Sequence, residues 1–455
     1  MTTVKTIGTT QLPEGPTAPA LVQFVNWLAR PFDYLEECVE RYGDVFTMRL
    51  IGLPPLVFIA DPQGIKQIFS TDSQSFDVGQ TNELARPILG DRSIILMDGS
   101  QHKRERKLLM PPFHGEKVKS YAESICQITA AVTSRWEIGK PLIARDVAQE
   151  ITLKVIMQTV FGVDGKEKYA QFGSLLAEWL NITASPVRSS FIFLKFLQVD
   201  LGTWSPWGNF IRTRQKIYDL LQAEIDERRA HPEKLGNDIL SLMLSVTDED
   251  GQPMSDDQLK DELVTLLVAG HETTATSLAW AFYWLEQRPE SKAKLLSEID
   301  SLGKNPDPIE ISRFSYLTAV CQETLRLYPI VPIAFARIAK QDIEIMGRFF
   351  KAGTTLVPCI YSTHHREDLY PDSKQFRPER FLERQYTPYE FLPFGGGVRL
   401  CLGYALAMLE MKLVIASVLS TYTLELAGRQ SIKPKRRGGT LAPSNGVLLV
   451  PTGLR

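Results

Sequence analysis

The segment at residues 391–407, FLPFGGGVRLCLGYALA, constrains the fold most strongly, because it places one cysteine directly before a long apolar helical pattern. At a helix start, free backbone amides and the positive end of the helix dipole stabilise an anion such as the thiolate of Cys401. Gly397 and Gly403 flank this residue and permit turns and close approaches that a side chain would block. The thiolate is the form of cysteine that binds metal, so the segment predicts a metal ligand. An inert buried cysteine is the common alternative for such a residue taken alone.

Two further side chains of this segment favour a bound group. Arg399 stands two residues before the cysteine and can reach an anionic group at the edge of a cofactor, while Phe394 can shield the sulfur from water. The three glycines at 395–397 do not form a phosphate loop, because neither GxxxxGK[ST] nor GxGxxG is completed.

Apolar residues at helical spacing dominate the chain, and strand-like segments are confined to its two ends. The clearest helix is expected at 255–287, where S-D-D-Q forms a capping box; its length is on the order of 50 Å. Other helices are expected at 27–42, over most of 101–300, from 312 to 328 and at 403–422. Strands are expected from 45, from 55, at 342–347 and at 354–359. This order predicts a mainly α fold with a small segregated β portion.

Composition gives no sign of a divided or nucleic-acid-binding chain. No linker, low-complexity tract or repeat interrupts the 455 residues, so we expect a single domain covering 1–455. A net charge of −2 gives no general affinity for nucleic acid or an anionic membrane. The basic run at 433–437 stands beside Gly438 and Gly439, and we expect a solvated loop there.

Cysteine usage and the first residues bear on the compartment. The five cysteines are too scattered for a disulfide framework or a Cys-x-x-Cys metal clip, which indicates a reducing environment. The start, MTTVKTIGTTQLPEG, shows neither the apolar core of a signal peptide nor the apolar run of a membrane anchor. We therefore expect a cytoplasmic protein without a membrane anchor.

A second cluster, AGHETT at 269–274, falls in the middle of the long predicted helix. Gly270 costs about 1 kcal/mol there relative to alanine, and the Thr273 hydroxyl can bond the carbonyl of Ala269 and bend the helix. Together they can open a notch wide enough for dioxygen and water. Taken alone, Glu272 would be an ordinary solvated residue beside a core threonine.

A third cluster pairs charges on an apolar helix. Glu323 and Arg326 are three residues apart and share one helix face. An exposed pair of this kind contributes a few tenths of a kcal/mol, whereas a buried pair needs further partners. FRPERF at 376–381 supplies one in Arg380.

The segment at 394–403 resembles the haem-ligand signature of the cytochrome P450 family, F-x-x-G-x-R-x-C-x-G, with every fixed position filled. The resemblance implies that Cys401 is the axial ligand of the haem iron. It also implies the family's fold, a triangular prism in which haem b lies between the long central helix and the helix after the cysteine. We expect an α-rich lobe at about 100–330 and 400–420, and a β-rich lobe at about 40–75, 330–365 and 420–455.

The resemblance also implies roles for the other clusters. AGHETT resembles the family's oxygen-activation motif, with Thr273 as the alcohol that hydrogen-bonds dioxygen and Glu272 as the acid that relays protons. E-x-x-R followed by P-E-R-F resembles its structural triad, so Glu323, Arg326 and Arg380 would hold the loop at 391–403 that contains Cys401, here called the cysteine loop. Four basic residues would bind the haem propionates, with a surface charge as the alternative for each: His102, Arg106, Arg337 and Arg399. Three further residues would line the haem pocket: Phe394, Ala269 and Gly270.

The implied function is that of a monooxygenase, an oxidoreductase that inserts one oxygen atom of dioxygen into a C–H bond by hydroxylation or epoxidation. We expect a lipophilic substrate such as a fatty acid or terpenoid, electrons from a separate ferredoxin or flavodoxin with its reductase, and a monomeric enzyme. Lys103, Arg104 and Lys107 form a candidate docking patch for the donor, with a solvated helix face as the alternative. A peroxide-driven haem peroxygenase and a non-catalytic haem-binding sensor remain open.

Apolar stretches are expected to shape the substrate pocket, namely 76–97, the helix near Ala269, 333–335 and the chain near Val447. The first stretch holds Arg86 and Arg92, and either could anchor a substrate carboxylate. A surface position is the alternative for both arginines, so the sequence does not choose between acidic and neutral substrates.

Overall fold

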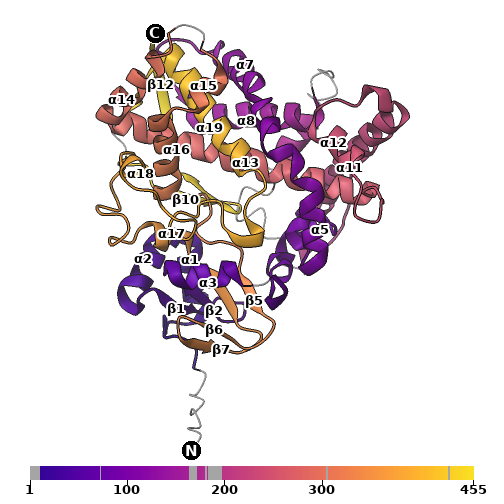
Figure 1. The fold of residues 1–455 in the computed structure, drawn as a ribbon, viewed down its shortest axis with the longest axis vertical. Helices are drawn as coiled ribbons and strands as arrows, with labels where there is room; N and C mark the ends of the chain where they lie inside the picture. Colours follow the sequence, from indigo (N-terminus) through magenta and orange to yellow (C-terminus); the bar gives the residue numbers. More distant parts are fainter. Residues whose placement is uncertain are drawn as a thin grey trace, which may run out of the picture.

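The computed structural model describes residues 11–71, 73–162, 172–179, 182, 197–303, 306–428 and 431–455. Most helices gather in one body, and a small sheet lies at the end of the molecule nearest the N-terminus (Figure 1). The predicted mainly α fold with a small β portion is confirmed.

The helices of the described residues are, in chain order, α1 (Ala20–Ala29), α2 (Pro31–Tyr42), α3 (Pro62–Ser70), α4 (Arg86–Leu89), α5 (Gly99–Leu109), α6 (Glu116–Lys119), α7 (Ala122–Thr133), α8 (Ala144–Phe161), α11 (Pro206–Ala230), α12 (Ile239–Ser245), α13 (Asp256–Gln287), α14 (Pro289–Asp300), α15 (Pro308–Ser312), α16 (Ser315–Leu327), α17 (Ile360–His364), α18 (Arg380–Glu383) and α19 (Tyr404–Thr421). The single helix predicted at 27–42 is wrong. Two helices meet there, because Pro31 lacks an N–H group and starts α2 at its first position.

The long helix α13 runs through the middle of the helical body and contacts α8, α16 and α19 (Figure 1). It begins with the predicted capping box: Gln258 N–H donates to Ser255 Oγ (3.3 Å), and Ser255 N–H donates to Gln258 Oε1 (3.0 Å). Its 32 residues correspond to about 48 Å. One helix can therefore pack in the core and also form a wall of the central cavity.

The main sheet has the strand order β1 (Val45–Met48), β2 (Leu56–Ile59), β8 (Thr355–Pro358), β5 (Arg337–Ala339) and β3 (Phe76–Asp77). Strands β2 and β8 are parallel, with Leu56 opposite Thr355, and the other neighbours are antiparallel. The continuous apolar run of β2 suits an inner strand that is covered on both faces. β6 (Ile343–Ile345) and β7 (Arg348–Phe350) form a separate hairpin.

The C-terminal strands do not join this sheet. β12 (Leu448–Leu454) is the middle strand of a separate sheet and pairs with β4 (Leu142–Ile143) on one side and β9 (Tyr422–Leu426) on the other. It lies at the opposite end of the molecule, beside the helices (Figure 1). The predicted placement of 420–455 in the β-rich lobe is therefore wrong for β9 and β12. The physical reason is that β9 follows α19 without a connecting loop and stays at the end of that helix.

The basic run is a strand and not the solvated loop that we predicted. β10 (Pro434–Arg437) pairs with β11 (Thr440–Pro443), and Gly438 and Gly439 form the turn between them. Arg436 stands opposite the buried Leu441, and its guanidinium lies 5.4 Å from the centre of the Trp27 ring. The hairpin was missed because alternating buried and exposed cations look uniformly polar in the sequence.

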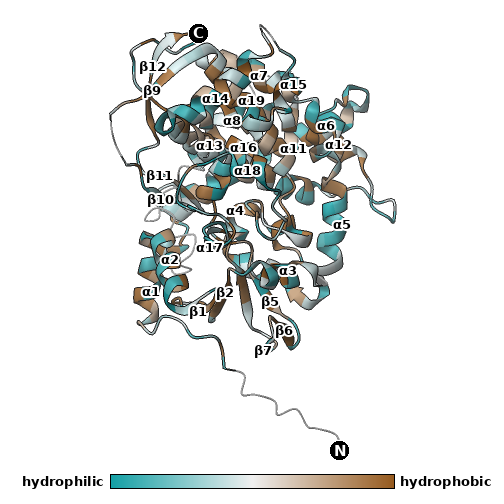
Figure 2. Ribbon diagram, turned by 60° about the vertical axis from the view of Figure 1, so that its left-hand side comes forward, coloured by the Kyte–Doolittle hydropathy of each residue, from teal (hydrophilic) through white to brown (hydrophobic). Residues whose placement is uncertain are grey.

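By length and composition alone, α19 is the one described helix that is long and apolar enough to cross a membrane. In this fold 56% of it is buried, so it serves as a core helix of the body. Helix α5, by contrast, is mainly hydrophilic along its length (Figure 2).

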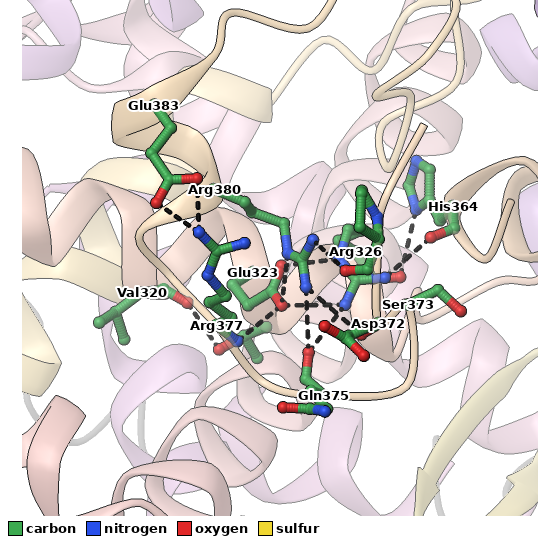
Figure 3. A network of polar contacts seen from close by, with 12 residues as sticks. Val320, Glu323, Arg326, His364, Asp372, Ser373, Gln375, Arg377, Arg380 and Glu383 are labelled. Carbon is green, nitrogen blue, oxygen red and sulfur yellow. Dashed lines mark hydrogen bonds and ion pairs between the residues drawn. The ribbon is translucent and has the colours of Figure 1, made fainter. Parts of the chain in front are cut away.

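A buried charge network joins α16 to the chain that leads into the cysteine loop (Figure 3). Both oxygens of Glu323 accept hydrogen bonds from Arg326 (2.6 and 2.9 Å), and Arg380 Nε donates to Glu323 Oε1 (3.1 Å). Glu323 and Arg326 have no exposed side-chain surface, and Arg380 is 2% exposed. The three predicted triad residues therefore meet, and two guanidinium groups compensate one buried carboxylate.

The network continues through His364 toward the cysteine loop. Arg326 Nη1 donates to the carbonyl of His364 (2.8 Å), and Leu392 N–H donates to His364 Nε2 (2.9 Å). Burial, together with Arg326, lowers the pKa of His364 to about 3, so the ring is neutral and Nε2 is free to accept. Leu392 lies two residues before Phe394, so the network sets where the cysteine loop begins.

We predict that Arg326→Ala unfolds more easily by about 3–5 kcal/mol, because it leaves the buried Glu323 carboxylate with incomplete compensation. The protein should also be isolated without its cofactor. Arg377→Ala is the matched control: Arg377 makes an exposed ion pair with Glu383, whose loss should cost less than about 1 kcal/mol. Urea unfolding and an absorption spectrum measure both effects; normal cofactor content in Arg326→Ala would contradict the assignment.

Candidate functional site

A cavity of about 920 Å³ lies between the helical body and the sheet. Its walls come from α13, α5, the cysteine loop, β5 and the turn between β1 and β2. The predicted site residues that line it are Cys401, Phe394, Arg399, His102, Arg106, Arg337, Ala269, Gly270 and Thr273. The exception among the predicted cofactor and catalytic residues is Glu272.

The cysteine loop is shaped by glycines where the chain turns. Gly395 and Gly397 have φ values of 71° and 63°, which L-residues with a side chain rarely adopt. At Gly397 a Cβ atom would lie 2.9 Å from the carbonyl oxygen of Phe69, at the end of α3. Cys401 N–H donates to the carbonyl of Phe394 (3.1 Å), which closes the loop, and the free surface of the cysteine faces the cavity inside the molecule.

The Cys401 sulfur depends on its surroundings for its charge. Burial raises the pKa of the thiol, while a hydrogen bond from the Gly403 backbone and the charge of Arg106 lower it. Burial outweighs the helix-start effect that we predicted from the sequence, so the loop alone does not produce the thiolate. A bound metal cation deprotonates a coordinating thiol, and the site is therefore complete only with its metal.

The predicted cluster on α13 presents one hydroxyl to the cavity. Thr273 Oγ1 donates to the carbonyl of Ala269 (2.7 Å), as predicted. A Cβ atom at Gly270 would lie 3.1 Å from Cδ1 of Ile156, so the glycine permits α8 to pack closely against α13. Thr273 can turn its hydroxyl from Ala269 toward a small molecule in the cavity, because a side-chain hydroxyl both donates and accepts.

Glu272 does not line the cavity. Its carboxylate accepts hydrogen bonds from Arg145 (2.6 Å) and Gln149 (2.6 Å), both on α8, and Arg145 is 3% exposed. Thr273 and Glu272 are adjacent in the sequence but their side chains diverge by about 100° around the helix axis. The structure thus separates the acid from the alcohol that the sequence placed together.

Four basic side chains converge on the cavity. Burial and the nearby Arg399, Arg106 and Arg337 lower the pKa of His102 to about 3. Burial also lowers the pKa of Arg337 to about 10, again with Arg399 contributing. Arg399 donates to the carbonyl of Ile94 (3.1 Å) and to Asp98 Oδ1 (2.7 Å).

This basic cluster fits an anionic cofactor. Among the described residues, Asp98 is the carboxylate that bonds to it, and Arg399 Nε is buried without a partner. Buried cations without counter-charges are costly, so the cluster is incomplete by itself. The two propionate groups of haem b supply the missing negative charge, and Cys401 stands at the same cavity. The residues present therefore fit haem b.

Two other predicted groups are not at the cavity. Arg86 bonds Glu83 and Asp91 on the surface, and Arg92 is exposed, so neither is placed to hold a substrate carboxylate there. They were predicted only from proximity in the sequence to the pocket-forming stretch.

The predicted donor-docking patch is largely neutralised. Arg104 pairs with Asp248, and Lys107 pairs with Glu249 (3.0 Å). Of the three cations, Lys103 is the one without an ion pair to a described residue. The partners were not foreseen because they are far away in the sequence.

Sequence reasoning missed one wall of the cavity. Val447 is buried in the core, and the residues that reach the cavity from the C-terminal part of the chain are Arg436 and Gly439 of the β10–β11 hairpin. Trp27 and the apolar turn between β1 and β2 also line it. The dipeptide Gly438-Gly439, which is typical of a two-residue hairpin turn, is the one signal in the sequence that could have indicated the hairpin.

Comparisons with known proteins agree with this site. The family model described as Cytochrome P450 matches residues 13–450. The putative cytochrome P450 135B1 of Mycobacterium tuberculosis is 35% identical over 436 residues, covering 96% of this chain and 90% of the relative. The putative cytochrome P450 135A1 of the same species is 32% identical, covering 97% and 95%.

Solved structures show the same fold. Retinoic acid bound cyanobacterial CYP120A1 superposes with a TM-score of 0.82 at 26% identity, covering 98% of this chain and all of that one. The haem domain of cytochrome P450DA gives a TM-score of 0.83 at 23% identity, covering 98% and 97%. The chain therefore belongs to the cytochrome P450 family, and it is a haem-thiolate monooxygenase with haem b as its cofactor.

Proposed function

We propose that this enzyme inserts one oxygen atom of dioxygen into a C–H bond of a lipophilic small molecule, a fatty acid or a terpenoid. The observation that carries the proposal is a single large cavity with the Cys401 sulfur and the Thr273 hydroxyl both on its walls. A thiolate ligand favours cleavage of the O–O bond, and a hydroxyl beside the cavity can direct protons to it.

In this proposal the chain first holds the cofactor. Cys401 would ligate the haem iron and Phe394 would shield its sulfur, while His102, Arg106, Arg337 and Arg399 would bind the two propionates. Glu323, Arg326 and Arg380 hold the loop that carries the cysteine. When bound, haem b supplies dioxygen binding and the electron transfer needed to oxidise a C–H bond.

The residues of α13 then govern proton supply. Thr273 donates its hydroxyl hydrogen bond to dioxygen in place of the Ala269 carbonyl. Glu272 carries protons from solvent, for which it must exchange its bonds to Arg145 and Gln149 for bonds toward the cavity. Its side chain is 21% exposed, so it has access to water from its present position.

The lining of the cavity supports a lipophilic substrate. The turn between β1 and β2 contributes Leu50, Leu53 and Pro54, and the chain after α16 contributes Ile330 and Ile333. A related structure bears the description retinoic acid bound, which names an apolar molecule with one carboxylate. Such a guest matches apolar walls with few polar groups.

We also propose a separate ferredoxin or flavodoxin with its reductase as the electron source. Lys103 is the member of the predicted patch that stays free to meet an acidic donor. The five cysteines carry free thiols, which suits a cytoplasmic enzyme, and we propose that the enzyme acts as a monomer.

Turnover with isotopically labelled dioxygen tests the proposed reaction. The haem-loaded enzyme, given a ferredoxin or a flavodoxin, a reductase and a lipid substrate, should yield product with one labelled oxygen atom. Label that enters only from labelled hydrogen peroxide would indicate a peroxygenase. Absence of product with any donor and substrate would leave haem binding without catalysis and would refute the proposed reaction.

Thr273→Val should keep substrate affinity but lose coupling, because valine has the same shape without the hydroxyl. We expect product per electron to fall by roughly tenfold or more while hydrogen peroxide rises. Thr276→Val is the matched control, since Thr276 is buried on the same helix and does not line the cavity. Oxygen consumption, peroxide and product are measured together; unchanged coupling in Thr273→Val would count against the assignment.

A further inference from the structure

We propose that Arg436 binds the carboxylate of an acidic lipid substrate at the wall of the cavity formed by α1 and β10. The inference rests on the proposed function and narrows it, since it selects a carboxylic acid with a long apolar body over a neutral terpenoid.

The position of Arg436 is fixed by an aromatic ring and one carbonyl. Its guanidinium lies 5.4 Å from the centre of the Trp27 ring, and Nη2 donates to the Trp27 carbonyl (3.3 Å). Both residues line the cavity. Trp27 is itself held edge-on against Phe58 of β2, with ring centres 5.8 Å apart. The stacked guanidinium is thus oriented before any ligand binds, and pre-orientation lowers the entropic cost of binding.

Arg436 has no counter-ion in the part of the chain that the structure describes. Its Nε is buried without a hydrogen-bond partner, and no carboxylate of the described residues pairs with it. Burial alone lowers the pKa of Arg436 to about 10, so it remains charged at neutral pH. Three other buried arginines do have carboxylate partners: Arg145 with Glu272, and Arg326 and Arg380 with Glu323. Apart from the bond of Nη2 to the Trp27 carbonyl, the guanidinium keeps N–H donors for a carboxylate, which accepts two parallel N–H bonds from arginine.

Arg436 is separate from the cations assigned to haem. Beyond the effect of burial, the charges of Arg399, Arg106 and Arg337 lower the pKa of His102. The charge of Arg399 also lowers the pKa of Arg337, and that of Arg106 lowers the pKa of Arg399, so these four residues are neighbours. Arg436 lies on β10 beside Trp27 of α1, whereas these four residues lie on α5, on β5 and in the cysteine loop. The cavity therefore has a second cationic position, on a different wall, that the propionates do not account for.

The surroundings of Arg436 suit the apolar part of such a substrate. Leu441, opposite Arg436 in the hairpin, donates its N–H to the carbonyl of Ile330 (2.9 Å), which brings the hairpin against the apolar chain after α16. Ile330 and the leucines of the β1–β2 turn line the same cavity. A carboxylate at Arg436 would leave the hydrocarbon chain against these residues and direct it away from the surface of β10.

Binding measurements on the haem-loaded enzyme test whether Arg436 is the anchor for the substrate carboxylate. Calorimetry and the spin-state spectrum would compare a chain-length series of saturated fatty acids with the corresponding methyl esters. For Arg436→Met we expect the affinity for the acids to fall by roughly tenfold or more, because a charged, bidentate hydrogen bond is lost. The affinity for the esters should stay the same or rise, because methionine preserves the volume and apolar stem of the side chain.

Lys435→Met is the matched control. Lys435 precedes Arg436 on β10, points to the opposite face and is exposed, so both affinities should stay unchanged. Arg436→Lys keeps the charge without the planar fork and should retain part of the acid affinity. Equal affinities of Arg436→Met and the wild type for the acids, or equal losses for acids and esters, would overturn the anchor.

The anchor and the proposed function fail in different ways. A wild-type enzyme that binds and oxidises only the esters would overturn the anchor and leave the monooxygenase proposal intact. Lack of binding by every acid would have the same meaning. Loss of the haem spectrum in the wild type would instead contradict the proposed function, whereas calorimetry would still report on Arg436.

Discussion

The shared carboxylate of Glu323 is the interaction on which the cofactor site depends. It binds two guanidinium groups, and through Arg326 it reaches the carbonyl of His364, whose neutral ring accepts the N–H of Leu392. Two residues later the Phe394 carbonyl accepts the N–H of Cys401. A buried ion pair gives little net stability compared with apolar packing. The ion pair acts here by positioning: together with His364 it connects the buried helix α16 by hydrogen bonds to the glycine-rich loop that carries the Cys401 sulfur.

The cavity has more basic than acidic groups on its walls among the described residues. Four basic groups face it, and burial is the main cause that lowers the pKa of each, with repulsion from neighbouring arginines adding to the shift at His102, Arg337 and Arg399. The thiol of Cys401 is likewise held in its neutral form by burial. An iron cation with two propionates reverses both conditions at once, so cofactor binding and folding stability are linked. Arg436 stands outside the cluster around His102, since it lies on β10 beside Trp27 and has no carboxylate partner among the described residues.

Much of this could be predicted from the sequence because it is local. The capping box of α13, the pairing of Glu323 with Arg326, and the bond from Thr273 to Ala269 depend on residues within one or two helical turns. What could not be predicted involves distant segments. The partners of Glu272 and Arg104 come from distant segments, and β12 pairs both with β9 and with the strand at 142–143. The hairpin at β10 was hidden because its inward arginine is as polar as its outward neighbours.

That hairpin has a mechanical consequence. Successive side chains of a strand point to opposite faces, so Arg436 faces the cavity while Arg437 faces the other way. The charges that act on Arg437 are those of Arg145, Glu272 and Asp146. Two adjacent residues of β10 therefore have different surroundings: Arg436 lines the cavity, and Arg437 lies near the charged group that includes Glu272. Because a single peptide unit separates these two residues, the backbone of β10 holds the cavity-facing guanidinium at a fixed place relative to the charges around Glu272.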